Sequence, residues 1–223
     1  MHVSVVIPTL DRQKLLSRTI KSIRASSYKD LTIVIIVDGN PDLLKAARRM
    51  PADTVMWNEK RQDWIRSMNR ALASIDDGAV LYASDDLVFE PRCIEHAVQR
   101  LKRKTPKGDG LVPINQDVRG CSTAFGLLGR AFIERFPQRA VFCPDYIHYC
   151  SDAELGRFTR SIGRLFMCDE ARVTHYRPKD NTYRTAKPVE QRDLGYQRMR
   201  VAEGLLWGKS FRLLSKRGQN ALA

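Results

Sequence analysis

The stretch that decides the fold of this chain is Ala79-Val80-Leu81-Tyr82-Ala83-Ser84-Asp85-Asp86. It begins with a short apolar run bounded by Gly78, which predicts a buried strand. A strand that ends in two carboxylates places them at the edge where open α/β sheets bind ligands. Such close carboxylates repel each other unless a cation or a hydrogen-bond donor lies between them. Because carboxylate oxygens suit Mg²⁺ or Mn²⁺, we expect a divalent metal that holds a diphosphate. The alternative is that residues 84–86 cap a following helix.

Strand and helix signals alternate through the first 115 residues. Apolar, β-branched runs predict strands at 3–7 and 31–37 and a weaker strand at 54–57. Between and after them, amphipathic patterns predict a helix from Asp11 to about residue 25, a helix at 62–75 and a helix that begins at Pro91. This alternation predicts an α/β fold with a mostly parallel sheet flanked by helices. Neither G-x-G-x-x-G after the first strand nor G-x-x-x-x-G-K-[ST] occurs, which disfavours NAD-dependent enzymes and P-loop proteins.

The second half of the chain is less regular and shows no boundary between separately folded domains. A helix at 151–162 is the clearest element, and short strands are expected near 165–168 and 172–175. The segment 177–187 is rich in Pro, Lys and Asn and predicts a loop, whereas residues 189–215 predict a basic helix. We therefore expect a single domain with a basic helical C-terminal extension.

Composition narrows the class of protein further. Hydrophobic residues make up 43% of the 223 residues, enough for a sizeable core. No run approaches the ~18 apolar residues of a membrane span, and the N-terminus lacks the pattern of a signal peptide, so we expect a cytoplasmic protein. The five cysteines, an odd number without a Cys-x-x-Cys pair, predict reduced thiols rather than a zinc site or a disulfide framework.

Positive charge is concentrated at the C-terminal end. The net charge is +13, and residues 156–223 hold fifteen Lys and Arg against six Asp and Glu, a net of +9. Residues 1–155 hold the remaining 23 against 19, a net of +4. This imbalance predicts a negatively charged partner such as a diphosphate donor, an anionic lipid surface or nucleic acid. A solvated basic face without a specific partner is the alternative.

Four features follow one another along the chain. Three are strand ends, at Ile7-Pro8-Thr9, Val37-Asp38-Gly39 and Ser84-Asp85-Asp86, and the fourth is Asp152-Ala153-Glu154-Leu155 at a helix start. In this order they resemble the GT-A glycosyltransferases, and specifically the inverting family 2. The resemblance covers about residues 3–176 and implies a GT-A, Rossmann-like domain. It divides that domain into a nucleotide-binding half, 1–115, and an acceptor half, 116–176, followed by an extension at 177–223.

Further matches and one departure accompany this resemblance. Arg12 lies soon after the first strand, Arg66-Ser67-Met68-Asn69 matches an R-x-x-N element, and Val173-Thr174-His175 matches a V-x-H element. The departure is Ser151, where the family usually has Glu. The Q-x-x-R-W motif of processive synthases is absent, so the resemblance implies an enzyme that adds one sugar or a few.

The resemblance implies a donor site and a metal site. A carboxylate at the position of Asp38 can accept a hydrogen bond from a nucleotide base or ribose, and in the family this position reads the base. Arg12 and Arg66 could offset phosphate charge. Asp86 and His175 would ligate Mn²⁺ or Mg²⁺, so that the nucleotide can leave as an anion. The alternatives are a turn-forming role for Asp38, surface salt bridges for the arginines and a structural role for His175. The implied donor-binding residues are Pro8, Thr9, Arg12, Asp38, Arg66 and Asp85.

The resemblance implies that Asp152 is the general base. In an inverting transfer, one carboxylate removes the proton from the acceptor hydroxyl as that oxygen attacks the anomeric carbon. A helix start near the carboxyl edge of the sheet gives a carboxylate the reach for this role. The alternative is that Asp152 caps its helix. Glu154 and Asp145 remain rival candidates for the base.

Several classes of acceptor are compatible with the sequence. The donor expected from the resemblance is a UDP-sugar, and the acceptor is a glycan or lipid-linked precursor, or a hydroxylated base in DNA. The stretch 204–218 mixes Leu, Trp and Phe with Lys and Arg, a pattern suited to peripheral contact with an anionic membrane or to packing on the domain. Basic residues could also follow a nucleic-acid backbone. A sugar nucleotidyltransferase and a non-catalytic nucleic-acid-binding protein are the alternative functions.

Overall fold

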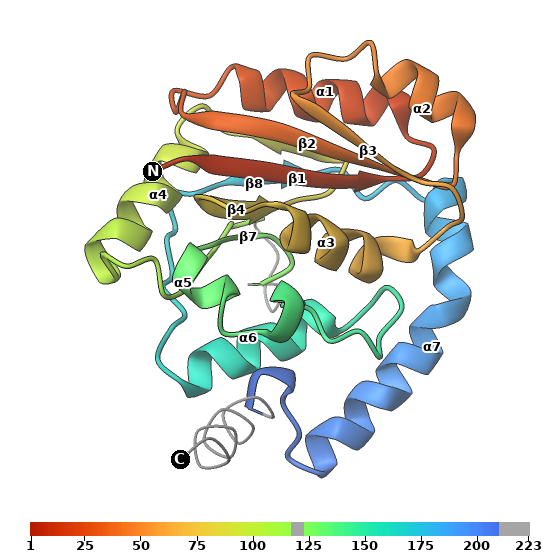
Figure 1. Cartoon of the computed structure of the whole chain (residues 1–223). Helices are drawn as coiled ribbons and strands as arrows, with labels where there is room; N and C mark the ends of the chain where they lie inside the picture. The colour runs from red at the N-terminus through yellow and green to blue at the C-terminus, as the bar shows by residue number, and fades with distance from the viewer. Residues whose placement is uncertain (117–122, 210–223) are drawn as a thin grey trace, which may run out of the picture.

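The computed structural model describes residues 1–116 and 123–209 and has a six-stranded central sheet (Figure 1). The strand order is β3-β2-β1-β4-β7-β6. The first four strands along the chain pair in parallel, and the last two pair antiparallel. The chain therefore builds outward from β1 to β3 and returns to place β4 on the other side of β1. The strands are β1 (Val3–Thr9), β2 (Leu31–Asp38), β3 (Thr54–Asn58), β4 (Ala79–Tyr82), β6 (Leu111–Pro113) and β7 (Gly126–Leu128).

This reversal of strand order creates a switch point between β1 and β4. In open α/β sheets, the crevice outside the carboxyl ends of the strands at such a switch point is where ligands bind. The β1–β4 register pairs Val6 with Tyr82, so the two chains leave the sheet side by side. Thr9, the last residue of β1, and Asp85, just beyond β4, therefore come together at that edge.

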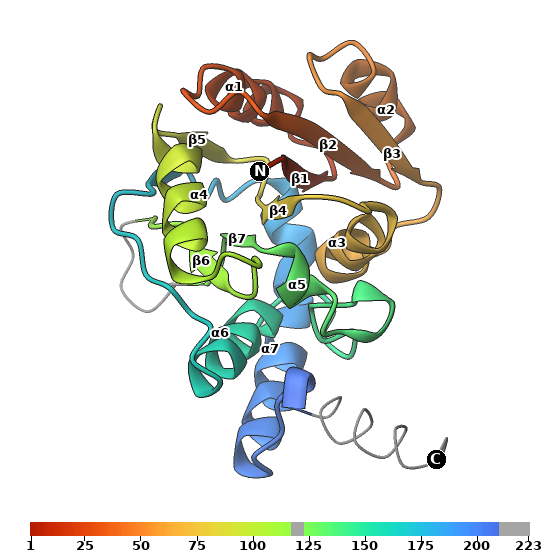
Figure 2. The ribbon, with the colours of Figure 1, turned by 60° about the vertical axis from the view of Figure 1, so that its left-hand side comes forward.

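Two hydrophobic layers form because side chains alternate along each strand. One layer contains Val3, Val5 and Ile7 of β1, and the other contains Val6. The first face is covered by α1 (Gln13–Arg24), α2 (Pro41–Ala47) and α4 (Cys93–Lys104). The second is covered by α3 (Asp63–Ser74), α5 (Arg130–Ile133) and α6 (Ser151–Ser161), and Figure 2 shows α1 and α3 on opposite sides of the sheet.

Three further elements complete the domain. A short antiparallel ribbon pairs β5 (Leu87–Phe89) with β8 (Val173–His175), in a register that sets Leu87 opposite His175. A 3₁₀ turn, η1, spans Pro137–Arg139, and the longest helix, α7, spans Asn181–Ala202. In both views α7 runs from the level of the sheet down past α6 (Figures 1 and 2). None of the described helices has both the length and the apolar character that a membrane crossing requires.

The predicted α/β fold with a mostly parallel sheet flanked by helices is confirmed. The predicted loop at 177–187 is wrong from residue 181 onward, because Asp180 caps α7 by accepting a hydrogen bond from the amide of Tyr183. The predicted cap at Asp11 is also wrong. Helix α1 begins at Gln13, and the Asp11 carboxylate instead accepts hydrogen bonds from Asn181 and Thr182 on α7.

Two further expectations differ from the structure in detail. The helix expected to begin at Pro91 begins at Cys93, and the Ser84-Asp85-Asp86 segment leads into β5 rather than capping a helix. The C-terminal stretch is described only as far as residue 209. In that part Leu206 and Trp207 pack against the core, and the rest of the predicted amphipathic segment lies outside the described residues.

Candidate active site

A cavity of about 510 Å³ lies at the carboxyl ends of the strands. Its size falls within the ~300–1,000 Å³ typical of small-molecule sites. Besides the strand ends, it is lined by the start of α3, the loop 148–152 and parts of the segment 175–186. The predicted site residues that line it are Pro8, Thr9, Arg12, Asp38, Asp85, Asp86, Asp152 and His175.

Asp85 and Asp86 are both buried at the base of this cavity. Asp85 Oδ2 accepts a hydrogen bond from Thr9 Oγ1 at 2.7 Å, and the Thr19 hydroxyl holds the Asp85 backbone carbonyl at 3.0 Å. Burial raises the pKa of Asp85 to about 7, and the contacts with Arg12 and Thr9 offset only part of this effect. Burial would also raise the pKa of Asp86, but His175 and Arg12 outweigh it and hold that pKa below its ordinary value.

Arg12 lies between the two carboxylates. Its Nη1 donates to Asp85 Oδ1 at 3.2 Å and to Asp86 Oδ2 at 3.1 Å. Its Nε donates to Asp180 Oδ2 at 2.8 Å, so the guanidinium is shared among three acids. Although burial opposes the charged form, Asp180 and the aspartate pair raise the pKa of Arg12 above its ordinary value, so it stays cationic. Arg12 is thus the donor that the close carboxylates require.

His175 completes this cluster from the neighbouring ribbon. Its Nδ1 lies 2.7 Å from Gln116 Oε1, and Arg177 Nη2 donates to the same oxygen at 2.6 Å. Since Arg177 can only donate, the Gln116 atom that it contacts is an oxygen, and Nδ1 of His175 must therefore carry the proton. This leaves Nε2, at 3.2 Å from Asp86 Oδ1, as the ring nitrogen that can ligate a cation.

The donor set fits a divalent cation shared with a ligand. Asp86 Oδ1 is a buried oxygen without a hydrogen-bond partner among the described residues, and it faces His175 Nε2. Within residues 1–116 and 123–209, no group of three or more His, Cys, Asp or Glu forms a metal-binding arrangement. Two protein groups suffice where phosphate oxygens complete the coordination, as is usual for Mg²⁺.

Asp38 faces the cavity but its carboxylate already accepts three hydrogen bonds. Oδ1 accepts from Asn58 Nδ2 at 2.9 Å and from the amide of Gln62 at 2.8 Å, and Oδ2 accepts from the amide of Asp63 at 2.9 Å. Asp38 therefore holds the start of α3 against the end of β2. The following Gly39 has a positive φ of 74°, and a Cβ there would lie 3.0 Å from the backbone nitrogen of Arg61.

Of the three candidate bases, only Asp152 lines the cavity. It is the second residue of α6, after Cys150, which serves as the N-cap in the left-handed conformation. The helix-cap alternative for Asp152 therefore does not hold. Burial raises the pKa of Asp152, and the backbone amides of Asp152 and Ala153 offset part of this effect.

Glu154 and Asp145 are engaged elsewhere. Glu154 is buried in a two-point ion pair, with Arg200 Nη2 2.7 Å from Oε1 and Arg200 Nε 2.8 Å from Oε2. It also accepts from Tyr146 Oη at 2.8 Å. Asp145 is exposed and accepts from Tyr196 Oη at 2.8 Å. Neither lines the cavity, so their contacts are those of structural residues.

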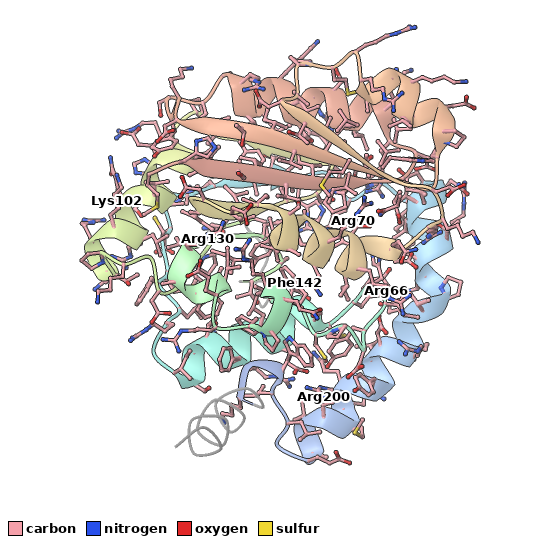
Figure 3. All side chains as sticks on the ribbon, viewed as in Figure 1. Arg66, Arg70, Lys102, Arg130, Phe142 and Arg200 are labelled. Carbon is pink, nitrogen blue, oxygen red and sulfur yellow. The ribbon has the colours of Figure 1, made fainter. Side chains whose placement is uncertain are left out.

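Arg66 is the one predicted site residue that the structure does not bring to the cavity. It is exposed on α3 and is absent from the lining (Figure 3). Sequence reasoning also missed lining residues that carry polar or aromatic groups. These are Arg61, Asp63 and Trp64 at the start of α3, His148 and Tyr149 before α6, and Thr182 and Tyr183 on α7.

Sequence and structure comparisons place the chain among known proteins. The sequence matches the profile described as Glycosyl transferase family 2 over residues 4–158. No curated protein matches the sequence significantly. Among solved structures, the fold is similar to the mannosyltransferase PcManGT from Pyrobaculum calidifontis, in complex with GDP-Man and Mn²⁺, with a TM-score of 0.65 and 17% identity. That match covers 83% of this chain and 60% of the mannosyltransferase chain.

The S. aureus protein TarS is also similar in fold. Its residues 1–349, in complex with UDP-GlcNAc, match with a TM-score of 0.62 and 13% identity, over 81% of this chain and 60% of the TarS chain. This chain thus spans about 60% of the length of these two structures. At these identities the likeness concerns the fold.

Proposed function

The chain belongs to glycosyl transferase family 2, and from this premise we propose that it transfers a sugar from a nucleotide-diphosphate donor to an acceptor hydroxyl, with inversion. The observation that carries the proposal is the set of side chains that line the cavity. It combines a buried carboxylate pair, a histidine whose Nε2 faces one of them, and the carboxylate of Asp152 at a helix start. These are the groups needed to hold a diphosphate and to deprotonate an acceptor.

In this transfer, the proton leaves the acceptor, a new glycosidic bond forms and the bond to the nucleotide breaks. Asp152 takes the proton of the acceptor hydroxyl, and the acceptor oxygen forms a bond to the anomeric carbon. The bond from that carbon to the diphosphate oxygen breaks, and its electron pair leaves with the nucleotide. The raised pKa of Asp152 makes its carboxylate a stronger base than an exposed aspartate.

Asp86 and His175 are the residues that would hold Mn²⁺ or Mg²⁺. When bound, the cation would supply Lewis-acid stabilisation of the negative charge on the diphosphate. His175 is oriented for this role by Gln116, whose Oε1 accepts from Nδ1 and leaves Nε2 facing Asp86. Arg12 keeps the two carboxylates from repelling each other.

We propose that residues 1–115 bind the donor, residues 116–176 bind the acceptor and residues 177–223 form an extension. Asp38 and the last residues of β1, Pro8 and Thr9, form the wall of the cavity that would bind the nucleotide. A UDP-sugar is the expected donor, and the solved structures similar in fold, which hold GDP-Man or UDP-GlcNAc, support a nucleotide sugar.

We propose an anionic acceptor, because basic side chains line the cavity beyond the donor residues. Arg61, Arg177 and Lys179 all reach its wall. A glycan or lipid-linked precursor is the acceptor we favour, and a hydroxylated base in DNA is the alternative. DNA binding that is strong at low salt and falls steeply with added salt would favour the DNA acceptor.

Thermal-shift binding tests the donor part of the proposal. Wild type and Asp86→Ala are compared against nucleoside diphosphates and nucleotide sugars, with and without Mn²⁺. Ligands that bind only the folded state raise Tm as their concentration exceeds Kd. We expect a metal-dependent rise for one nucleotide that disappears in Asp86→Ala. A wild type that shifts with no nucleotide, or an Asp86→Ala variant that shifts and turns over like wild type, would overturn the mechanism.

A further inference from the structure

A buried carboxylate on α7 holds the loop that leads to the candidate base. Asp193 is 0% exposed, and its carboxylate faces the backbone amides of three consecutive residues. Ile147 N lies 3.2 Å from each carboxylate oxygen, and the amides of His148 and Tyr149 each lie 2.9 Å from Oδ2. Three amides that converge on one anion form a rigid backbone nest.

The contact joins two distant parts of the chain. Asp193 lies 44–46 residues beyond the loop and outside the segment 4–158 that matches the family profile. Arg192 Nη1 also lies 2.8 Å from Asp193 Oδ1, on the exposed side of the helix. Burying a carboxylate is costly unless donors compensate it, and here the loop amides provide that compensation. The position of the loop is therefore tied to the position of α7.

The loop that Asp193 holds forms one wall of the cavity. Residues 148–152 line it without interruption, and only Cys150 and Ser151 separate the held amides from Asp152. Cys150 adopts a left-handed conformation with a φ of 70° and has no side-chain hydrogen bond that caps α6. The start of α6 thus depends on the loop before it and on Thr123, whose hydroxyl donates to the Asp152 carbonyl at 2.9 Å.

From this geometry we infer that Asp193 is a positioning residue for Asp152. It acts through the backbone of residues 147–149 and does not touch the reacting atoms. The inference rests on the proposed function, because it assumes that Asp152 is the base. Rate depends steeply on the placement of such a group, since a displacement of about 1 Å can cost about 100-fold. Asp193 should therefore control kcat while leaving donor binding on the other half of the domain unchanged.

The test replaces Asp193 by asparagine, which has the same shape. Its amide nitrogen cannot accept, so part of the amide nest loses its acceptor. In Asp193→Asn we expect hydrogen exchange at the amides of residues 147–149 to accelerate by roughly tenfold or more. We also expect kcat for transfer to fall by about 100-fold, with the donor KM within about twofold of wild type.

Tyr196→Phe is the matched control. Tyr196 lies on α7 one turn beyond Asp193, and the substitution removes only its hydroxyl, which bonds to Asp145 and Arg200 and not to the amides that Asp193 holds. The ring that packs against Tyr146 is kept. The loop exchange and kcat of this variant should stay close to wild type. If Asp193→Asn does not fold, Asp193→Glu keeps the charge and displaces it by one methylene. It should show the same loss of kcat at constant KM.

The two readouts separate this inference from the proposed function. Hydrogen exchange needs no substrate, so unchanged exchange in a folded Asp193→Asn variant overturns the inference whatever the enzyme does. Faster exchange with unchanged kcat, in a wild type that transfers sugar, also overturns it. A wild type that transfers no sugar from any nucleotide donor overturns the proposed function and the catalytic part of the inference together. In that case, the exchange rates would show only whether Asp193 holds the amides of residues 147–149.

Discussion

Arg12 and Asp180 form a two-point ion pair, with Nε 2.8 Å from Oδ2 and Nη2 3.0 Å from Oδ1. The same guanidinium contacts Asp85 and Asp86 through Nη1. Asp180 in turn caps α7 through the amide of Tyr183 at 3.1 Å. One arginine therefore joins the carboxylates of Asp85 and Asp86 to the first turn of α7, which lines the cavity. A change in the charge of Asp85 or Asp86 therefore alters the contacts that Arg12 makes with Asp180, the residue that caps α7.

Asp180→Asn tests this link. The variant loses the charge of the two-point ion pair but keeps an oxygen that can cap α7, and we expect the free energy of unfolding to fall by about 1 kcal/mol. Without the ion pair, residues 177–186 become ordered only when the donor binds. The cost of this ordering should weaken donor affinity by about tenfold. Urea denaturation and nucleotide titration measure the two effects. Asp42→Asn is the control, because the Asp42–Lys45 pair is 89% and 75% exposed and should contribute little.

Gln116→Leu tests the orientation of His175. The variant removes the oxygen that accepts from Nδ1 and so loses the constraint on the tautomer. Loss of such a partner typically costs about 10- to 100-fold in metal affinity, and we expect this range for Mn²⁺ in the presence of nucleotide. Calorimetric titration with Mn²⁺ gives the measurement. Gln99→Leu, on the exposed face of α4, is the control. Equal Mn²⁺ affinities in the two variants would show that Gln116 does not support metal binding.

The pH dependence of kcat should follow the ionisation of the Asp152 carboxylate. A base must be ionised to act, so activity falls as pH falls through its pKa. Burial raises this pKa, so the acidic limb should lie above the ~3.9 of an exposed aspartate. Wild-type rates from pH 4 to 9, at saturating donor and metal, give the profile. Asp152→Asn should lose about 100-fold or more in kcat with a near-wild-type Tm, and an active Asp152→Asn would show that another group is the base.

The sequence predicted the parts of the site that follow from local pattern. Strands β1, β2 and β4 are apolar and end at polar residues, and their parallel pairing brings Thr9, Asp38 and Asp85 to one edge. The position of His175 also followed from a short motif. Arg66 shows the limit of such motifs, because a match to R-x-x-N says nothing about which face of α3 meets the cavity.

Other parts depend on contacts between distant segments. A composition rich in Pro, Lys and Asn favoured a loop at 177–187, yet α7 begins within this segment and continues through Pro188. Its start is held by Asp180 and by contacts with Asp11 and Arg12. His148 reaches the cavity because Asp193, far along the chain, holds its backbone. No pattern of residue spacing predicts the contacts at the start of α7 or those of Asp193, because both depend on how α7 packs on the rest of the domain.

Glu154→Gln separates a structural carboxylate from a catalytic one. Glu154 follows Asp152 by two residues, just over half a helical turn. Its oxygens face Arg200 of α7, whose position Figure 3 shows, and the amide of Trp207 at 2.6 Å. Contacts with Arg200, Trp207 and Tyr146 outweigh the effect of burial and lower the pKa of Glu154, so it is a weak base at neutral pH. Removing one partner of a buried pair leaves the other charge uncompensated.

We therefore expect Glu154→Gln to lower the free energy of unfolding by about 3–5 kcal/mol, and the double variant with Arg200→Met to recover part of that loss. Urea denaturation of the two single variants and the double variant gives the cycle. The kcat per folded molecule should remain close to wild type, because Glu154 lies outside the cavity. A Glu154→Gln protein that unfolds like wild type but has lost turnover would make Glu154 the base and Asp152 the structural residue.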